Sequence, residues 1–327
     1  IGVGMNAFVS KNLGQHNQEG VNKSALHGIF LELINYLIFL CIGLFVVNKF
    51  MKTQTNIAEI VDSGTTYLRI VCICSFGIFT QVSFERLLQS TGKTLLSMTT
   101  QLTGAIINII LDPILIFGLF GMPKLGIAGA AIATVIGQIV AGIFAVVLNI
   151  KKNKEIHLHL KGFKLEKKYI GRILYVGVPS VLMVAIGSVM SYGMNLILMT
   201  FSSTAVAVFG AYYKLQSFVF MPIFGLNNGM VPIVSFNLGA KNKDRLVKTV
   251  KLGVCYAVGI MLVGLVIIQT MPGALLKMFN ASEQMLAIGI PALRIISVSF
   301  VFAGFSIIAS STFQALGNGI LSMLVSF

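Results

Sequence analysis

One acidic side chain stands in a very apolar stretch of the chain. Asp112 lies in NIILDPILIFGLF, with Asn108 four residues earlier and Pro113 directly after it. A helix places residues four apart on one face, and a proline leaves the carbonyl four residues before it, here that of Ile109, without its amide partner. The resulting carboxylate, amide and free carbonyl can bind a proton or a small cation. We therefore expect an ion-coupling site at Asp112; the structural alternative is that it only satisfies local polar groups.

Two further carboxyl groups fall within predicted apolar helices. Glu85, in SFERLLQSTGKT, precedes Arg86 and stands near a helix end. It is a second candidate for ion coupling, and an interfacial carboxylate is the competing interpretation. Glu32 follows His27 by five residues in HGIFLELINY. Charged groups within membrane helices are costly and often functional, but for Glu32 and His27 we expect a structural role.

The second half of the chain offers polar residues among methionines and aromatic rings. Such adaptable side chains suit a cavity that accepts varied apolar ligands. Taken one by one, most of these residues are also explained by core packing or by contact with lipid. The candidate substrate-cavity residues are Tyr192, Asn195, Tyr212, Gln216, Met221 and Asn227.

The composition indicates the elements that hold these residues. Apolar residues make up 56% of the 327 residues and charged residues 10%, whereas soluble domains carry about 25% charged residues. Residues 180–213 contain no Asp, Glu, Lys or Arg, and about 20 apolar residues span a bilayer as a helix. We predict an all-α polytopic membrane protein. Helices are expected near 24–47, 64–88, 95–120, 127–150, 173–201, 205–236, 246–271 and 288–313, with one ending near Val9 and another beginning near 320.

The basic residues are unevenly distributed over the predicted loops. One set of alternate loops and adjoining helix ends holds 17 of the 24 Lys and Arg residues, Lys161 among them. Loops rich in Lys and Arg face the cytoplasm. The net charge of +14 is therefore better explained by membrane orientation than by nucleic acid. We expect residues 11–23, 151–172 and 237–251 to face the cytoplasm, and residues 48–62 and 272–287 to face outside.

A long internal repeat organises the chain. GMNAFVSKNLGQHNQEGVNK, starting at Gly4, matches GMVPIVSFNLGAKNKDRLVK, starting at Gly229, at nine of twenty positions and a spacing of 225 residues. About six helices fit in this interval, and an even number returns the chain to the same side of the membrane. We predict two parallel six-helix lobes: residues 1–150 (helices 2–6), a cytoplasmic loop at 151–172, and residues 173–327 (helices 7–11). About ten of some twelve helices are then at least partly present. A first helix and the end of the second lobe are expected outside this sequence.

The motifs expected of enzymes are missing. The chain has no HExxH, GxSxG, Walker A or GxGxxG pattern, which argues against an enzyme and for energy from an ion gradient. The four cysteines lie in apolar segments without the spacing of metal ligands or of a disulfide framework. We expect no metal site, no cofactor beyond a coupling ion, and a monomer.

The chain resembles the multidrug and toxic compound extrusion (MATE) family. The resemblance rests on GVGMNAFVSKNLGQHN, FERLLQSTGKT, NIILDPILIFGLFGMPKLGIAGAAIAT, VPIVSFNLGAKN and FQALGNG, in this order. It implies twelve helices in two lobes in the cell (inner) membrane, and export of organic, often cationic, compounds by H⁺ or Na⁺ antiport.

The resemblance also implies roles for particular residues. The Asn and Asp of the family's fifth helix match Asn108 and Asp112, and Thr134 on the next helix is a candidate for the same network. The acidic residue usual on the family's first helix lies outside this sequence. Some members carry an acidic residue on the seventh helix, and residues 173–201 have none, which assigns coupling to the first lobe.

A flippase of lipid-linked oligosaccharides from the same superfamily is the alternative function. Such a flippase would share the two-lobe plan and would line its cavity with several basic residues. In this sequence only Lys214 lies deep in a predicted helix of the second lobe.

Overall fold

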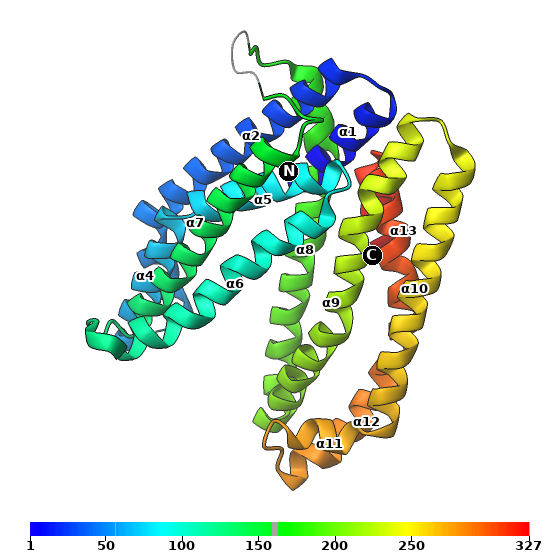
Figure 1. Cartoon of the computed structure of the whole chain (residues 1–327). Helices are drawn as coiled ribbons and strands as arrows, with labels where there is room; N and C mark the ends of the chain where they lie inside the picture. Colours follow the sequence, from blue (N-terminus) through cyan, green and yellow to red (C-terminus); the bar gives the residue numbers. More distant parts are fainter. Residues whose placement is uncertain (56, 159–162, 327) are drawn as a thin grey trace. The chain divides into compact units, whose positions relative to one another are not determined.

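A computed structural model describes residues 1–55, 57–158 and 163–326 (Figure 1). These residues form helices and connecting turns, and no strand is found among them. Lys161, one of the basic residues counted above, lies outside the described residues. The chain divides into two compact units, Ile1–Ile173 and Leu174–Phe327, which are described separately.

The first unit is a bundle of helices that pack both against neighbours in sequence and against helices farther along the chain. Its α6 and α7 lie side by side, and α7 also packs along α4 and α5 (Figure 1). The elements are α1 (Gly2–Gly14), α2 (Gln18–Cys41), a π-helical segment (Ile42–Val46), α3 (Val47–Gln54), α4 (Ala58–Ile73), α5 (Phe76–Ser90), α6 (Thr94–Phe117), a 3₁₀ turn (Leu119–Gly121), α7 (Ile127–Lys152) and the start of α8 (Lys167–Phe201).

The second unit holds the rest of α8 and a bundle around α9 and α10. These two helices pack against each other and against α13. Buried Met261, Leu293 and Ile308 are among the residues that form its apolar core. The elements are α9 (Ser203–Gly239), α10 (Lys243–Thr270), α11 (Pro272–Lys277), α12 (Glu283–Ser297), α13 (Phe300–Ala315) and α14 (Gly319–Ser326).

The helices α2, α6, α7, α8, α9 and α10 supply spans long and apolar enough to cross a membrane. Among the described residues six such spans occur, with α2 continued through α3, and the two bent pairs α4–α5 and α12–α13 raise the total to as many as eight. A helix rises about 1.5 Å per residue, so α7, with its 26 residues, exceeds the roughly 30 Å hydrocarbon core. The all-α polytopic architecture expected from composition is confirmed.

Several expected helices differ in detail from the structure. The segments expected as single helices at 64–88 and 288–313 are each broken, with bends of 47° between α4 and α5 and 46° between α12 and α13. At the first break, the Ser75 hydroxyl donates to the carbonyl of Cys72 at 2.8 Å, a local bond that competes with the regular helix ladder. Helix α8 begins at Lys167, six residues before the expected start.

Small residues allow α6 and α7 to pack closely. A Cβ atom added at Gly137 would lie 2.7 Å from the carbonyl oxygen of Gly104, and one added at Gly104 would lie 2.9 Å from the Cβ of Ala141. Gly–Ala faces let membrane helices approach until their backbones touch. The side chains on the facing surfaces of α6 and α7 are therefore held within reach of one another.

Candidate functional site

The Asp112 patch forms across the α6–α7 pair. Asn108 donates one amide hydrogen to Oδ1 of Asp112 at 3.3 Å and approaches Oγ1 of Thr134 at the same distance. Thr134 in turn donates to the carbonyl of Ala130 at 2.9 Å. The α6 residues Asn108 and Asp112 are one turn apart, and the close backbone approach at Gly137 brings Thr134 opposite them. The structure thus joins three of the four residues predicted for ion coupling.

The exposure of this patch suits reversible binding. Asp112, Asn108 and Thr134 are all half-buried. The hydrogen bond from Asn108 to Asp112 is long for a charge-assisted bond, so the carboxylate is weakly held. A carboxylate with one weak donor can accept a proton or contact a small cation together with an amide and a hydroxyl oxygen. The described residues include no cluster of three or more His, Cys, Asp or Glu suited to a metal ion.

Glu85 belongs to a separate polar network. Its side chain is 5% exposed. Gln81 donates to Oε1 at 2.9 Å, Thr100 to the same oxygen at 2.8 Å, and Gln101 to Oε2 at 2.9 Å. Buried carboxylates are stabilised by such convergent donors. The network involves α5 and α6, and among the described residues no hydrogen bond joins it to the Asp112 patch.

Sequence reasoning missed the donors around Glu85. Gln81 stands four residues before Glu85, so its place on the same face of α5 follows from the helix repeat. Thr100 and Gln101 lie on α6, beyond the turn at Gly92, and their approach to Glu85 depends on how the two helices pack. No local pattern in the sequence reports that contact.

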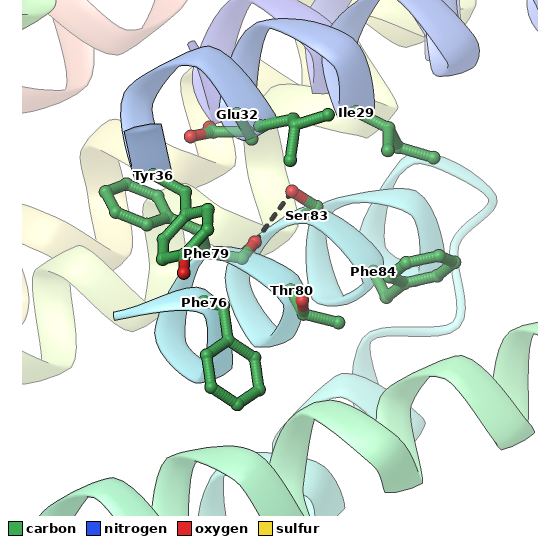
Figure 2. Close-up of a pocket in the computed structure, with 9 residues that line it drawn as sticks. Ile29, Glu32, Tyr36, Phe76, Phe79, Thr80, Ser83 and Phe84 are labelled. Atoms are coloured by element: carbon green, nitrogen blue, oxygen red, sulfur yellow. Dashed lines mark hydrogen bonds between the residues drawn. The ribbon is translucent and has the colours of Figure 1, made fainter. Parts of the chain in front are cut away.

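Glu32 lines a small cavity between α2 and α5. The cavity has a volume of about 160 Å³ and is mainly apolar and aromatic (Figure 2). Asn35 donates to Oε2 of Glu32 at 3.1 Å, and Glu32 is 6% exposed. The lining residues are Ile29, Glu32, Leu33, Tyr36, Phe76, Phe79, Thr80, Ser83 and Phe84.

The corresponding place in the second unit is filled. At the repeat spacing, Glu32 corresponds to Ala257 and Tyr36 to Met261, both fully buried. There Val219 and Ile223 of α9 belong to the same core cluster as Ala257 and Met261. The cavity is therefore a feature of the first unit that the second unit does not share, and its lining alone assigns no small molecule to it.

The six candidate substrate-cavity residues lie in the second unit and are differently placed. Tyr192 and Met221 are 64% and 67% exposed. Tyr212 packs against the unit's core, and Asn195 and Gln216 are half-buried. Within the described part of the chain no hydrogen bond is found between any two of the six.

Asn227 differs from the other five candidates. Its side-chain oxygen is buried and has no hydrogen-bond partner among the described residues. A buried acceptor without a donor is costly, so Asn227 is the candidate of the second unit with a free polar atom to offer a ligand.

Comparison with known proteins agrees with this architecture. A sequence model of the MatE family matches residues 1–114 and 179–327. The chain is 28% identical over 319 residues to the multidrug export protein MepA of Staphylococcus haemolyticus and 26% identical over 327 residues to that of Staphylococcus aureus strain MSSA476; each alignment covers 98% of this chain and 70% of the relative.

A solved structure has the same fold. It is described as the outward-facing conformation of a multidrug resistance MATE family transporter of the MOP superfamily. It aligns with a TM-score of 0.93 and 24% identity, over 99% of this chain and 72% of that one.

The chain is therefore a multi-pass membrane transporter rather than an enzyme. More particularly, it belongs to the MatE family, as its motifs predicted.

Proposed function

We propose that this chain exports organic, often cationic, small molecules across the cell (inner) membrane by antiport with H⁺ or Na⁺. Relatives of this sequence are multidrug export proteins. The Lys and Arg asymmetry orients residues 11–23, 151–172 and 237–251 toward the cytoplasm.

The observation that carries the coupling proposal is the Asp112–Asn108–Thr134 patch. Asp112 takes up and releases the coupling ion, and Asn108 is its neighbouring ligand, with Thr134 holding the amide in place. In a state open to the outside, the ion binds Asp112 and weakens its bond to Asn108. Helix α6, which contains Pro113, then bends there, and this change in the first unit leads to release of the drug.

Glu85 is the second coupling candidate, and its surroundings favour a more static role. Its carboxylate already accepts three hydrogen bonds, which must rearrange before a proton or cation can bind. Asp112 accepts one long bond and needs less rearrangement. On the substrate side, Asn227 supplies a buried acceptor, and the exposed Tyr192 and Met221 supply adaptable apolar surface.

The energy required is available from the membrane. One charge that crosses the membrane contributes about 2.3 kcal/mol per 100 mV, and a tenfold concentration ratio of drug requires about 1.4 kcal/mol. One coupling ion per transport cycle is therefore sufficient for an uncharged drug. Exchange of a monovalent organic cation for one H⁺ or Na⁺ moves no net charge, so the concentration gradient of the ion must then supply the energy.

Transport by the full-length protein in proteoliposomes tests this function. A fluorescent organic cation is placed on one side, and a pH gradient or a Na⁺ gradient is imposed separately. We expect one of the two gradients to drive accumulation against the drug gradient and dissipation of that gradient to stop it. If neither gradient drives transport and a lipid-linked oligosaccharide is translocated instead, the flippase alternative is correct.

A further inference from the structure

His27 lies buried at the end of the first unit where the chain leaves α7 and enters α8. Its side chain is fully buried, and it lies on α2, apart from the Asp112 patch. Two aromatic rings pack on its imidazole: Phe163 edge-on with ring centres 4.9 Å apart, and Tyr169 stacked at 5.3 Å. All contacts described below are within the first unit.

The hydrogen bonds of His27 fix its protonation pattern. Nδ1 lies 2.7 Å from the carbonyl oxygen of Lys23, which can only accept, so Nδ1 carries the hydrogen. The backbone N–H of Glu166 donates to Nε2 at 2.8 Å, so Nε2 must be unprotonated. The two backbone groups thus select the neutral ring with its hydrogen on Nδ1.

Glu166 directly precedes α8, which begins at Lys167. Its carbonyl accepts from the amides of Tyr169 and Ile170 at 3.1 and 3.3 Å. Lys23 also binds the Glu166 carboxylate at 2.6 Å while it pairs with Glu19. The first turn of α8 is therefore attached to α2 by one hydrogen bond and one ion pair, and the helix continues from there into the second unit.

We propose that His27 is a pH-sensitive catch that holds the start of α8 on α2 when neutral and loosens it when protonated. Protonation puts a hydrogen on Nε2, which then faces the N–H of Glu166, so the hydrogen bond becomes a contact between two donors. Histidine is the side chain suited to change charge at pH values between about 5 and 8. The start of α8 is thereby made responsive to acid.

Among the described residues, four charged or titratable groups contact His27 or its partners. From α2 they are Lys23 and, through it, Glu19; from α8 and the residue before it they are Tyr169 and Glu166. The ion pairs of Lys23 do not require His27 to be neutral, so they remain when the ring is protonated. The expected change is confined to the Glu166 amide and the first turn of α8.

Hydrogen exchange of the full-length transporter tests the catch directly. The peptide that contains Glu166 to Ile170 is followed by mass spectrometry at about pH 7.5 and about pH 5.5. Exchange is corrected with a peptide from the start of α10, where the amide of Arg245 bonds to the non-titrating Asn242. We expect about tenfold faster corrected exchange at the lower pH, the effect of losing one hydrogen bond.

Two variants separate His27 from other acid-sensitive groups. His27→Gln keeps an oxygen acceptor that does not titrate and should give the same corrected exchange at both pH values. His27→Phe keeps a packed ring without either nitrogen and should exchange fast at both. If His27→Gln already exchanges fast at neutral pH, the proposal is decided by the wild-type protein alone. Its exchange at the two pH values is compared after correction with the α10 peptide.

The proposal is overturned if wild-type exchange does not change with pH. It is also overturned if His27→Gln loosens at low pH as the wild type does, since another group is then the sensor. These outcomes do not depend on whether Asp112 couples transport, because drug and gradient are absent from the measurement.

Discussion

The two units share their backbone details and differ in the charges that they bury. In both, an asparagine caps the helix after the repeated motif: Asn17 accepts from the amide of Gly20 at 2.9 Å, and Asn242 from that of Arg245 at 3.1 Å. The bends of 47° and 46° also fall at equivalent positions. The repeated sequence thus specifies the same helical scaffold twice.

Between the units the acidic residues are distributed differently. At the repeat spacing, Glu32 and Glu85 of the first unit correspond to Ala257 and Ser310 of the second. Residues 174–327 contain Asp244 and Glu283 as their acidic residues, and both stand in the first turn of a helix, where a negative charge favours the helix dipole.

Ser310 occupies the position of the second unit that is equivalent to Glu85, and its hydrogen bonds are made with neutral groups. Its hydroxyl pairs with those of Ser322 and Ser326 at 2.7 and 2.9 Å, a neutral network in place of a caged carboxylate. The comparison teaches that the scaffold does not require the charges of the first unit. Those charges are candidates for function because the same fold is built without them.

Asp112→Asn tests whether an acidic residue of the first unit is needed for transport, and we expect it to have the largest effect on efflux. The amide imitates the protonated carboxyl and keeps its shape, but it cannot exchange an ion, so gradient-driven efflux should fall to background while the protein remains folded. Drug efflux from proteoliposomes under imposed pH and Na⁺ gradients measures this. Normal efflux at normal expression would place the coupling site elsewhere and would end the assignment of coupling to this patch.

Glu85→Ala should cost more stability than Ser310→Ala. Without its carboxylate, the buried donors of Gln81, Thr100 and Gln101 lose a charged acceptor, at a cost of about 3 kcal/mol, whereas Ser310→Ala removes two neutral hydroxyl pairs at about 0.5–1 kcal/mol each. Thermal unfolding of the detergent-solubilised protein gives both values. Equal losses in the two variants would show that the caged carboxylate is no more important to the fold than its neutral counterpart.

Ser10→Ala and Ser235→Ala test the shared part of the comparison. Ser10 donates to the carbonyl of Ser90 at 2.9 Å, and Ser235 to that of Ala315 at 2.8 Å. Each bond ties the repeated helix to the end of the bent pair. Both substitutions should therefore destabilise the protein by about 1 kcal/mol with efflux retained. A marked difference between the two shifts in melting temperature would mean that the two equivalent hydrogen bonds contribute unequally to stability.

Glu32→Gln should have the smallest effect on transport. The amide still accepts a hydrogen bond from Asn35, and the second unit packs the equivalent position with Ala257, so no charge is needed there for the fold. Efflux and melting temperature should stay close to those of the unsubstituted transporter. Loss of efflux as complete as in Asp112→Asn would extend the coupling site to α2.

Much of this architecture could be predicted from the sequence. Apolar length predicts spans because a bilayer forces backbone groups to bond within a helix, and the identities between Gly4 and Gly229 onward predict two similar units. The pairing of Asn108 with Asp112 follows from a spacing of four residues on a helix. Local rules of this kind need no knowledge of how helices pack.

What the sequence could not predict depends on contacts between distant segments. Thr134 reaches Asn108 because Gly104 and Gly137 let α6 and α7 touch. Glu85 accepts hydrogen bonds from Thr100 and Gln101, which lie on the next helix after a turn. The bond between His27 and Glu166 joins positions 139 residues apart. The sequence determined by itself which residues enter helices and which faces carry polar groups, because those follow from period and polarity. The tertiary structure decided which polar atoms meet, because a hydrogen bond requires a separation of about 3 Å that only helix packing sets.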